Sequence, residues 1–202
     1  MQDDFRICFF GDSLVNGTGD RQAMGWTGRV CAAANQEKFI VTNYNLGIRR
    51  NTSQDVLARW HTEFEQRKVN NADCRIVFSF GVNDTVIENR KTRVSEAISL
   101  TNARTIMTVA SDITQVAWIG PTPVDEKEHN IRISNLSRHF HQLADELGIA
   151  YLSVFEPLSN NSVWNGEVRN GDGSHPDSKG YTVLSELILN WPEWWKFKGL
   201  KD

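Results

Sequence analysis

Residues 7–17 read ICFFGDSLVNG. The apolar run up to Phe10 is continuous rather than alternating, which is typical of a strand buried on both faces of a parallel sheet. Gly11, Asp12 and Ser13 follow at the point where this strand ends. A serine in this place is common as a helix N-cap, but a glycine, an acid and a hydroxyl in succession also indicate a site of chemistry.

Apolar runs and helical patterns alternate along the rest of the chain. Val56, Trp60 and Phe64 recur at the four-residue spacing of one helix face. Thr52 and Asp55, just before them, are spaced as in a capping box. Five strands with helices between them predict an α/β fold, because parallel strands need crossovers that pack back on both faces of the sheet. The expected strands are 5–10, 40–46, 75–80, 115–119 and 149–154, and the expected helices include 52–67, 94–109 and 131–147.

Length and charge restrict the class of protein. With 202 residues the chain fits a single domain, 1–202, since one core commonly serves about 100–200 residues. The net charge of −3 and the lack of a dense basic stripe disfavour nucleic acid as a partner. Residues 1–4 lack the basic region of a signal peptide, and the apolar run after them is too short to span a membrane. We therefore expect a cytoplasmic protein without an integral membrane segment.

The cysteines and histidines do not indicate a metal site. Cys8, Cys31 and Cys74 are odd in number, and two of them lie in strand-like runs, so we interpret them as reduced and structural. His139 and His141 are two positions apart in a helical pattern, which turns them to different faces. The GxGxxG and Walker patterns are also absent from the sequence, so no phosphate cradle is indicated.

Residues in distant segments complement Ser13. In DGSHP, Asp172 and His175 are three positions apart, close enough for the carboxylate to hold the imidazole while its other nitrogen faces Ser13. An ester carbonyl attacked by a serine becomes an oxyanion, which needs hydrogen-bond donors already in place. The candidate donors at the same sheet edge are the backbone N–H groups of Ser13 and Gly47 and the side-chain amide of Asn83.

The sequence blocks around these residues resemble those of the SGNH, or GDSL, hydrolases. Each block alone is a weak signal, but the four occur in the family's order and at strand ends. The resemblance spans nearly the whole chain and implies a flavodoxin-like three-layer α/β/α sandwich with a five-stranded parallel sheet. The blocks are GDSL at 11–14, Gly47, GVND at 81–84 and DGSHP at 172–176.

The resemblance also implies a role for each matching residue. Ser13 is the expected nucleophile, with His175 as its base and Asp172 as the residue that orients the histidine. Gly47 and Asn83 are expected to join the backbone N–H of Ser13 as oxyanion donors.

Three further residues are candidates for contact with the substrate. Many family members have a second glycine soon after the first, where this chain has Arg49 and Arg50, and Arg50 could favour a substrate that bears negative charge. Trp164 lies in the expected long loop 155–174 and could form a wall of the acyl pocket. Asp12 is the third, although a structural hydrogen-bonding role suits it better than that of a second catalytic acid.

The sequence therefore predicts a serine esterase that needs no metal or cofactor. Short acyl esters, acetylated sugars, lysophospholipids and thioesters all present the required carbonyl, and the choice among them stays open. Two alternatives are a flavodoxin-like protein that binds a flavin or a phosphorylated ligand, and a non-catalytic domain with a relic site. For Trp191, Trp194 and Trp195 we expect packing at a helix end, with a homodimer or lipid contact as the alternative.

Overall fold

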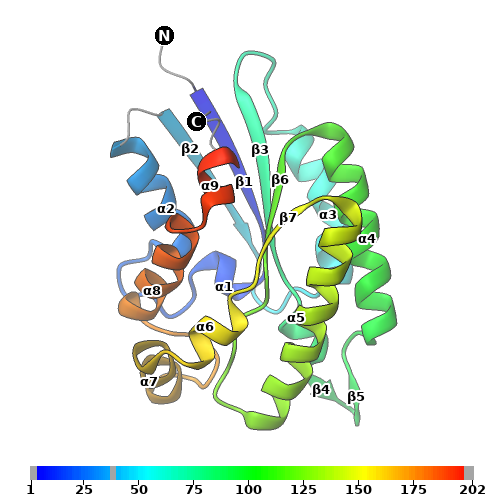
Figure 1. Cartoon of the computed structure of the whole chain (residues 1–202), viewed down its shortest axis with the longest axis vertical. Coiled ribbons are helices and arrows are strands. Elements are labelled where there is room, and N and C mark those ends of the chain that lie inside the picture. The colour runs from blue at the N-terminus through cyan, green and yellow to red at the C-terminus, as the bar shows by residue number, and fades with distance from the viewer. Residues whose placement is uncertain (1–3, 37–39, 198–202) are drawn as a thin grey trace.

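The computed structural model describes residues 4–36 and 40–197 and confirms the predicted α/β fold (Figure 1). The five strands of the main sheet are parallel, in the order β2-β1-β3-β6-β7. Each predicted strand is present, with small differences at its ends. The strands are β1 (Asp4–Gly11), β2 (Ile40–Gly47), β3 (Asp73–Ser79), β6 (Val116–Ile119) and β7 (Ala150–Leu152).

Helices cover both faces of this sheet. They are α1 (Ser13–Asn16), α2 (Gly25–Gln36), α3 (Ser53–Glu65), α4 (Glu96–Ile113), α5 (Lys127–Leu147), α6 (Phe155–Ser159), α7 (Ser162–Asn170), α8 (Ser178–Leu189) and α9 (Pro192–Phe197). Figure 1 shows α3, α4 and α5 on one face and α2, α8 and α9 on the other. Along β1, Ile7 and Phe9 pack in the core that contains α2, whereas Cys8 and Phe10 pack in the core that contains α3. Burial on both faces explains the continuous apolar run of this strand.

Two helix-end signals in the sequence act as predicted. Thr52 accepts the N–H of Asp55 at the start of α3, and the Asp55 side chain accepts the N–H of Thr52, so the capping box is complete. Gly148 ends α5 with a φ of 65°, a left-handed conformation that glycine adopts without steric penalty. α5 begins earlier than predicted, because the Glu126 side chain accepts the N–H of His129 and caps the helix.

The prediction of a long loop at 155–174 is wrong, because α6 and α7 occupy most of it. The Asn161 side chain caps α7 by accepting the N–H groups of Val163 and Trp164. Trp164 and Val168, one helical turn apart, are both buried in the core. The Ser, Asn and Gly residues of this segment favour a loop, but burial of two large side chains outweighs their weak helix propensity.

The C-terminal tryptophans pack against the domain as far as the structure describes them. Trp194 in α9 is fully buried in the core that contains α8, and Trp191 is partly buried against that core. The side chain of Trp195 lies outside the described residues. A homodimer contact through Trp194 would require α9 to leave this core, so the structure supports the packing interpretation for this residue.

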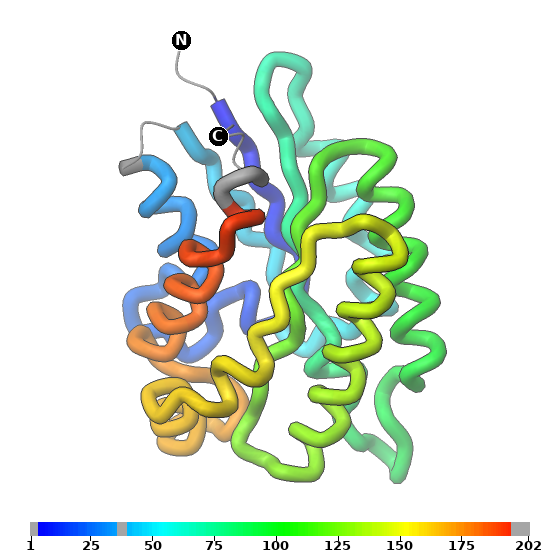
Figure 2. The backbone as a smooth tube through the Cα atoms, viewed as in Figure 1, coloured from blue at the N-terminus to red at the C-terminus, as the bar shows by residue number. Residues whose placement is uncertain are grey.

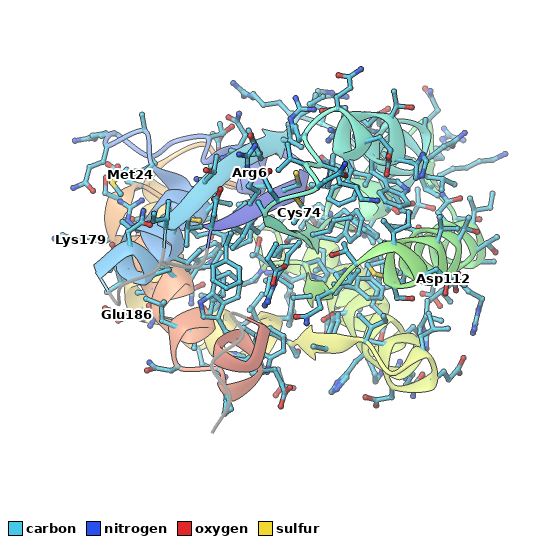
Figure 3. All side chains as sticks on the ribbon, turned by 90° about the horizontal axis from the view of Figure 1, so that it is seen from above. Arg6, Met24, Cys74, Asp112, Lys179 and Glu186 are labelled. Atoms are coloured by element: carbon cyan, nitrogen blue, oxygen red, sulfur yellow. The ribbon has the colours of Figure 1, made fainter. Side chains whose placement is uncertain are left out.

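Figure 3 shows the molecule from above, with charged side chains on the outer surfaces of the helices. Lys179 and Glu186 of α8 lie on one side, and Asp112 of α4 lies on the other; all three are exposed. Cys74 of β3 is half-buried near the middle and, like the other two cysteines, is a free thiol. Among the described helices, none combines the length and the apolar character needed to cross a membrane.

The segments that follow the strands gather at one end of the sheet, as the smooth trace in Figure 2 shows. They include α1 after β1, the turn after β2 and the 3-10 helix η1 (Asn83–Thr85) after β3. A short antiparallel hairpin, β4 (Ile87–Glu88) and β5 (Lys91–Thr92), also lies there. The sequence does not predict this hairpin, because two-residue strands leave no hydrophobic pattern. This edge therefore holds the blocks that resemble the hydrolase family.

Candidate active site

The turn after β1 presents Ser13 at the edge of the sheet. Gly11 ends the strand between β2 and β3, and a Cβ atom there would lie 1.9 Å from the carbonyl oxygen of Ser79, so glycine is required. The Asp12 side chain then caps α1 by accepting the N–H of Leu14 at 2.9 Å. Ser13 is the first residue of α1, and its backbone N–H has no hydrogen-bond partner within the described residues.

Ser13, His175 and Asp172 form a continuous hydrogen-bonded chain. The Nε2 atom of His175 lies 2.7 Å from Ser13 Oγ, across 162 positions of sequence. Its Nδ1 atom lies 2.7 Å from Asp172 Oδ2. The side chain of His175 is 12% exposed and that of Asp172 is 55% exposed, so the chain runs from solvent to the partly buried serine. The structure thus brings together the residues predicted as nucleophile, base and orienting acid.

The loop before α8 is built so that Asp172 and His175 face each other. Gly173 has a φ of 81°, in the left-handed region, and its carbonyl accepts the N–H of Asp125. The second carboxylate oxygen of Asp172 accepts the N–H groups of Ser174 and His175. Burial raises the pKa of Asp172, but hydrogen bonds from the His175 ring and from these two N–H groups outweigh it, so the pKa lies below its ordinary value. Asp172 therefore stays charged and fixes the ring.

Asn83 in η1 brings its side-chain amide to the same place. Its Nδ2 atom donates to the carbonyl of Asn51 at 3.0 Å and lies 3.4 Å from Asp12 Oδ2. The second contact is long, so this N–H can turn to a substrate oxygen at little cost. Asp84, next in the chain, is fully buried and accepts the N–H of Ser53 at the start of α3. This bond anchors η1, and with it the Asn83 amide, to a long helix.

The structure does not support the role of oxyanion donor that the resemblance implies for Gly47. Its N–H donates to Asn45 Oδ1 at 3.1 Å, and a Cβ atom would lie 2.2 Å from the backbone nitrogen of Asn16 in α1. Glycine is needed here for the close approach of β2 to α1. Among the described residues, Gly47 is not one that lines the cleft beside Ser13. The geometry therefore does not support Gly47 as an oxyanion donor.

A cleft of about 400 Å³ lies beside Ser13 and His175. Asp12 and Arg50, two of the predicted substrate contacts, line it. Trp164 does not, because α7 turns its indole into the core, where Nε1 donates to the carbonyl of Pro123. The prediction that Trp164 walls the acyl pocket is therefore wrong. The lining residues are Asp12, Ser13, Leu14, Arg49, Arg50, Val82, Asn83, Val86, His129, Ser174 and His175.

The two charged groups Asp12 and Arg50 differ in their surroundings. Burial raises the pKa of Asp12 to about 7; the N–H of Leu14 opposes this shift and the nearby charge of Asp84 adds to it. Arg50 is exposed, and its guanidinium pairs with Glu88 Oε1 on the hairpin at 2.8 Å. The hydrogen bonds of Asp12 stay within the protein, as a structural role requires, and Arg50 has its own counter-ion.

His129 lines the cleft and is a residue that sequence reasoning misses. It is 9% exposed, and its Nε2 atom lies 2.9 Å from Thr85 Oγ1 and 3.2 Å from the carbonyl of Val82. Burial lowers its pKa, so the ring is neutral at pH 7. The early start of α5, capped by Glu126, brings His129 to the cleft. His129 stands three positions after Glu126, but that spacing alone, without a strand end or a matching family block, does not single it out as a site residue.

The arrangement meets the requirements for an activated serine. A histidine that is held by a carboxylate can take the proton of Ser13 Oγ. The backbone N–H of Ser13 and the amide of Asn83 are uncharged donors at the same cleft, where an oxyanion would form. Within the described residues, no group of three or more His, Cys, Asp or Glu side chains is placed to hold a metal ion.

The sequence is similar to a known family and to a curated protein. The profile of the GDSL-like Lipase/Acylhydrolase family matches residues 9–183. The uncharacterized protein YpmR of Bacillus subtilis (strain 168) is 24% identical over 155 residues. That alignment covers 76% of this chain and 52% of YpmR, so the chain spans about half the length of the curated relative that it matches.

Solved structures share the fold. The chain is similar to a lipase/acylhydrolase from Enterococcus faecalis, with a TM-score of 0.75 and 21% identity, covering 94% of each chain. It is also similar to a catalytic mutant of Axe2, an acetylxylan esterase from Geobacillus stearothermophilus, with a TM-score of 0.74 and 16% identity, covering 94% of each chain. A protein of the lipolytic G-D-S-L family from Veillonella parvula DSM 2008 has a TM-score of 0.74 and 17% identity, covering 94% of this chain and 98% of that one. Because the family profile matches most of its length, the chain belongs to the GDSL-like lipase/acylhydrolase family.

Proposed function

We propose that the protein is a serine esterase in which Ser13 is the nucleophile, His175 the general base and Asp172 the residue that orients His175. The observation that carries the proposal is the hydrogen-bonded chain from Asp172 Oδ2 through the His175 ring to Ser13 Oγ, with both contacts at 2.7 Å. A serine hydroxyl is a poor nucleophile until a base removes its proton, and this chain supplies the base in a fixed orientation. Family membership supports ester hydrolysis.

The reaction has two halves. His175 Nε2 takes the proton of Ser13 as Oγ attacks the ester carbonyl, and the imidazolium, stabilised by Asp172, gives this proton to the departing alcohol. Water then enters, His175 takes one of its protons, and the hydroxide attacks the acyl-enzyme. Collapse of this second intermediate releases the carboxylic acid and returns the proton to Ser13 Oγ.

Each tetrahedral intermediate carries an oxyanion that needs donors in the cleft. The backbone N–H of Ser13 is unpaired within the described residues, and one N–H of Asn83 makes only the long 3.4 Å contact to Asp12. Both are held by main-chain and capping bonds, so little reorganisation accompanies the attack. One such donor typically contributes about 2.7–4 kcal/mol of transition-state stabilisation.

The cleft favours esters of a small acyl group with a polar alcohol. Of its lining residues only Leu14, Val82 and Val86 are apolar, in a volume of about 400 Å³. A long acyl chain needs a larger apolar surface, since each buried CH₂ contributes about 0.8 kcal/mol. Acetylated sugars and other short acyl esters or thioesters therefore fit better than lysophospholipids. One structure similar to this chain is that of an acetylxylan esterase.

No observation favours binding of a flavin or a phosphorylated ligand over hydrolysis. In the described structure the turn after β1 carries Asp12 and Ser13, with the serine bonded to His175. A phosphate site at this position usually has a glycine-rich turn that opens a helix. A visible absorption band in the purified protein would reveal a bound flavin.

Hydrolysis of p-nitrophenyl acetate by the wild type and by Ser13→Ala tests the proposal. We expect Ser13→Ala to lower kcat by about 10⁴- to 10⁶-fold, the range for loss of a triad member. Ser111→Ala is a matched control, because Ser111 is exposed on α4 and lies outside the cleft lining; its kcat is expected to equal that of the wild type. Hydrolysis by Ser13→Ala at the wild-type rate would contradict the proposal.

A panel of p-nitrophenyl acetate, butyrate and octanoate tests the acyl preference. We expect kcat/KM to fall from acetate to octanoate, because the three apolar lining residues cannot cover a long chain. A panel of acetylated sugars and simple alkyl acetates, with release of acetate as the readout, tests the preference for the alcohol. A higher kcat/KM for octanoate than for acetate would contradict the small-acyl assignment and leave the Ser13 assignment intact.

A further inference from the structure

The imidazole of His129 is a group in the cleft that the proposed reaction does not use. It is buried and lines the same cleft as Ser13. Its Nε2 atom contacts Thr85 Oγ1 and the carbonyl oxygen of Val82. In the part of the chain that the structure describes, no hydrogen bond uses the other ring nitrogen, Nδ1, and Nδ1 is not among the buried polar atoms without a partner. Solvent therefore reaches Nδ1, and the cleft is the open space that this side chain lines.

The contacts of Nε2 decide which ring nitrogen carries the proton. The Thr85 hydroxyl donates its single proton to the carbonyl of Val82 at 2.9 Å. The Thr85 oxygen and the Val82 carbonyl then face the ring as acceptors, so Nε2 is the donor. Burial lowers the pKa of His129 against the opposing bond to Val82, and the positive charge of Arg132 adds to the lowering, so the ring is neutral at pH 7. A neutral ring with its proton on Nε2 has a lone pair on Nδ1, which makes Nδ1 a hydrogen-bond acceptor.

The position of the ring is fixed by the two elements that it joins. At the start of α5, the Glu126 side chain accepts the N–H of His129 at 3.1 Å. Three positions later, Arg132 donates from Nε to the carbonyl of Thr85 at 2.9 Å, which ties α5 to η1 beside the ring. An acceptor that is already fixed loses little freedom when a ligand binds to it.

A hydroxyl group is the ligand that suits such an acceptor. Arg49 and Arg50, which also line the cleft, can donate hydrogen bonds but cannot accept them. The carboxylate of Asp12 already accepts the N–H of Leu14. A substrate hydroxyl that leaves water for the cleft needs an acceptor for its proton, because an unpaired buried O–H is costly. His129 Nδ1 supplies one.

We propose that His129 Nδ1 accepts a hydrogen bond from a hydroxyl in the alcohol part of the substrate, and that it thereby selects esters of polyhydric alcohols, such as partly acetylated sugars. This inference rests on the proposed esterase function. A small acyl group such as acetyl carries no hydroxyl, so the O–H that meets the imidazole belongs to the alcohol. His129 is then a binding residue and not a second base.

Two pairs of esters of equal size test the proposal. 2-Hydroxyethyl acetate and propyl acetate differ by an O–H in place of a methyl group in the alcohol, and ethyl glycolate and ethyl propanoate differ in the same way in the acyl group. In His129→Gln the amide nitrogen can take over the bonds of Nε2, but no atom replaces Nδ1. We expect the ratio of kcat/KM for 2-hydroxyethyl acetate to that for propyl acetate to be about five- to tenfold lower in His129→Gln than in the wild type. The ratio for the second pair should stay the same.

Two further variants serve as rescue and control. His129→Asn has a carbonyl oxygen close to the position of Nδ1, so we expect it to recover part of the lost ratio. His141→Gln makes the same change as His129→Gln at an exposed position of α5 outside the cleft lining, and both ratios should equal those of the wild type. Circular dichroism shows which variants are folded.

NMR of the wild type labelled with ¹⁵N tests the tautomer without any measurement of activity. The signals of the His129 ring are assigned by their absence in a folded variant of this residue. We expect a proton on Nε2 and none on Nδ1 at pH 7. A proton on Nδ1 would overturn the proposal, because that nitrogen could then not accept a hydrogen bond.

Equal losses for 2-hydroxyethyl acetate and propyl acetate in folded His129→Gln would also overturn the proposal, because that pattern follows from a weakened contact with η1 rather than from a lost substrate contact. A change confined to the ethyl glycolate pair would place the hydroxyl in the acyl group and contradict the assignment to the alcohol. Ser13→Ala, measured in parallel, separates this inference from the proposed function. If Ser13→Ala keeps its activity, the esterase assignment fails; if it is inactive and His129→Gln has the wild-type ratio, only the assignment of His129 fails.

Discussion

The segment 172–175 and the turn 48–51 lie at the same cleft but contribute to it differently. The first offers side chains, with the imidazole of His175 between Asp172 and Ser13, at 2.7 Å from an oxygen of each. The second meets the site through its main chain, because the carbonyl of Asn51 accepts a hydrogen bond from Asn83 Nδ2, while the Arg50 guanidinium pairs with the hairpin. Side-chain chemistry is visible in residue types and spacing. A main-chain contact depends on the backbone angles and on which backbone groups are already hydrogen-bonded, and residue identity does not report either.

A substitution in the segment 172–175 is expected to have the largest effect on kcat. Asp172→Asn should lower kcat by about 10⁴-fold, because the amide keeps the shape but no longer holds His175 in the productive tautomer. Steady-state hydrolysis of p-nitrophenyl acetate measures this loss. Asp112→Asn, the same change at an exposed position of α4 outside the cleft lining, is the control and should keep the wild-type kcat. A loss below about tenfold in Asp172→Asn would mean that His175 is oriented by other contacts.

Asn83 joins the two regions, since it is a side-chain donor that is bound to the main chain of the turn through Asn51. We expect Asn83→Ala to lower kcat by about 10²- to 10³-fold with little change in KM, because the lost bond is made mainly to the transition state. Asn165→Ala removes an amide that also donates to a backbone carbonyl, that of Ser159, but lies outside the cleft lining; it should keep wild-type kcat. A raised KM at constant kcat in Asn83→Ala would assign the amide to substrate binding instead.

Substitution of Asp12 is expected to have the smallest effect on kcat, but it should clearly change how the free energy of unfolding depends on pH. Burial raises its pKa in the folded protein to about 7, so the folded state binds a proton that the unfolded state, near its ordinary pKa of about 3.9, releases. The free energy of unfolding is therefore highest below the unfolded pKa and falls as the pH rises through about 7. Asp12→Asn keeps an acceptor for the N–H of Leu14 and should reduce this fall.

Urea unfolding of the wild type and of Asp12→Asn at about pH 5 and about pH 8 measures the difference. The wild type should lose more stability between the two pH values than the variant does. The same loss in both proteins would show that Asp12 is charged in the folded state throughout this range. The other titrating groups are the same in both proteins, so their contributions cancel to first order when the loss of stability in the variant is subtracted from that in the wild type.

The fold and the side-chain half of the site could be read from the sequence. The mostly apolar runs at 5–10 and 75–80 predict buried parallel strands, and helices do cover both faces of β1 and β3. Asp172 and His175 could be paired with each other because they lie on one short loop. Their proximity to Ser13 could be predicted from the topology, because the carboxyl ends of parallel strands lie at the same edge of the sheet.

The remaining parts of the site depend on tertiary contacts. Trp164 turns inward because it lies on the buried face of α7, a helix that Asn161 caps in a segment of loop-like composition. His129 reaches the cleft because α5 starts at its Glu126 cap rather than where the apolar period begins. Gly47 has the residue type of a donor, but Asn45 already uses its N–H. In each case the deciding factor is a hydrogen bond that composition and period do not contain.

Activation of Ser13 by His175 underlies every other inference. A fluorophosphonate probe tests this activation directly, because it reacts only with an activated serine Oγ. Mass spectrometry then locates the modified peptide. We predict rapid labelling of the wild type at Ser13 alone, and labelling of folded His175→Ala that is slower by orders of magnitude. Labelling at another serine, or equal rates in the wild type and His175→Ala, would contradict the activation of Ser13 by His175.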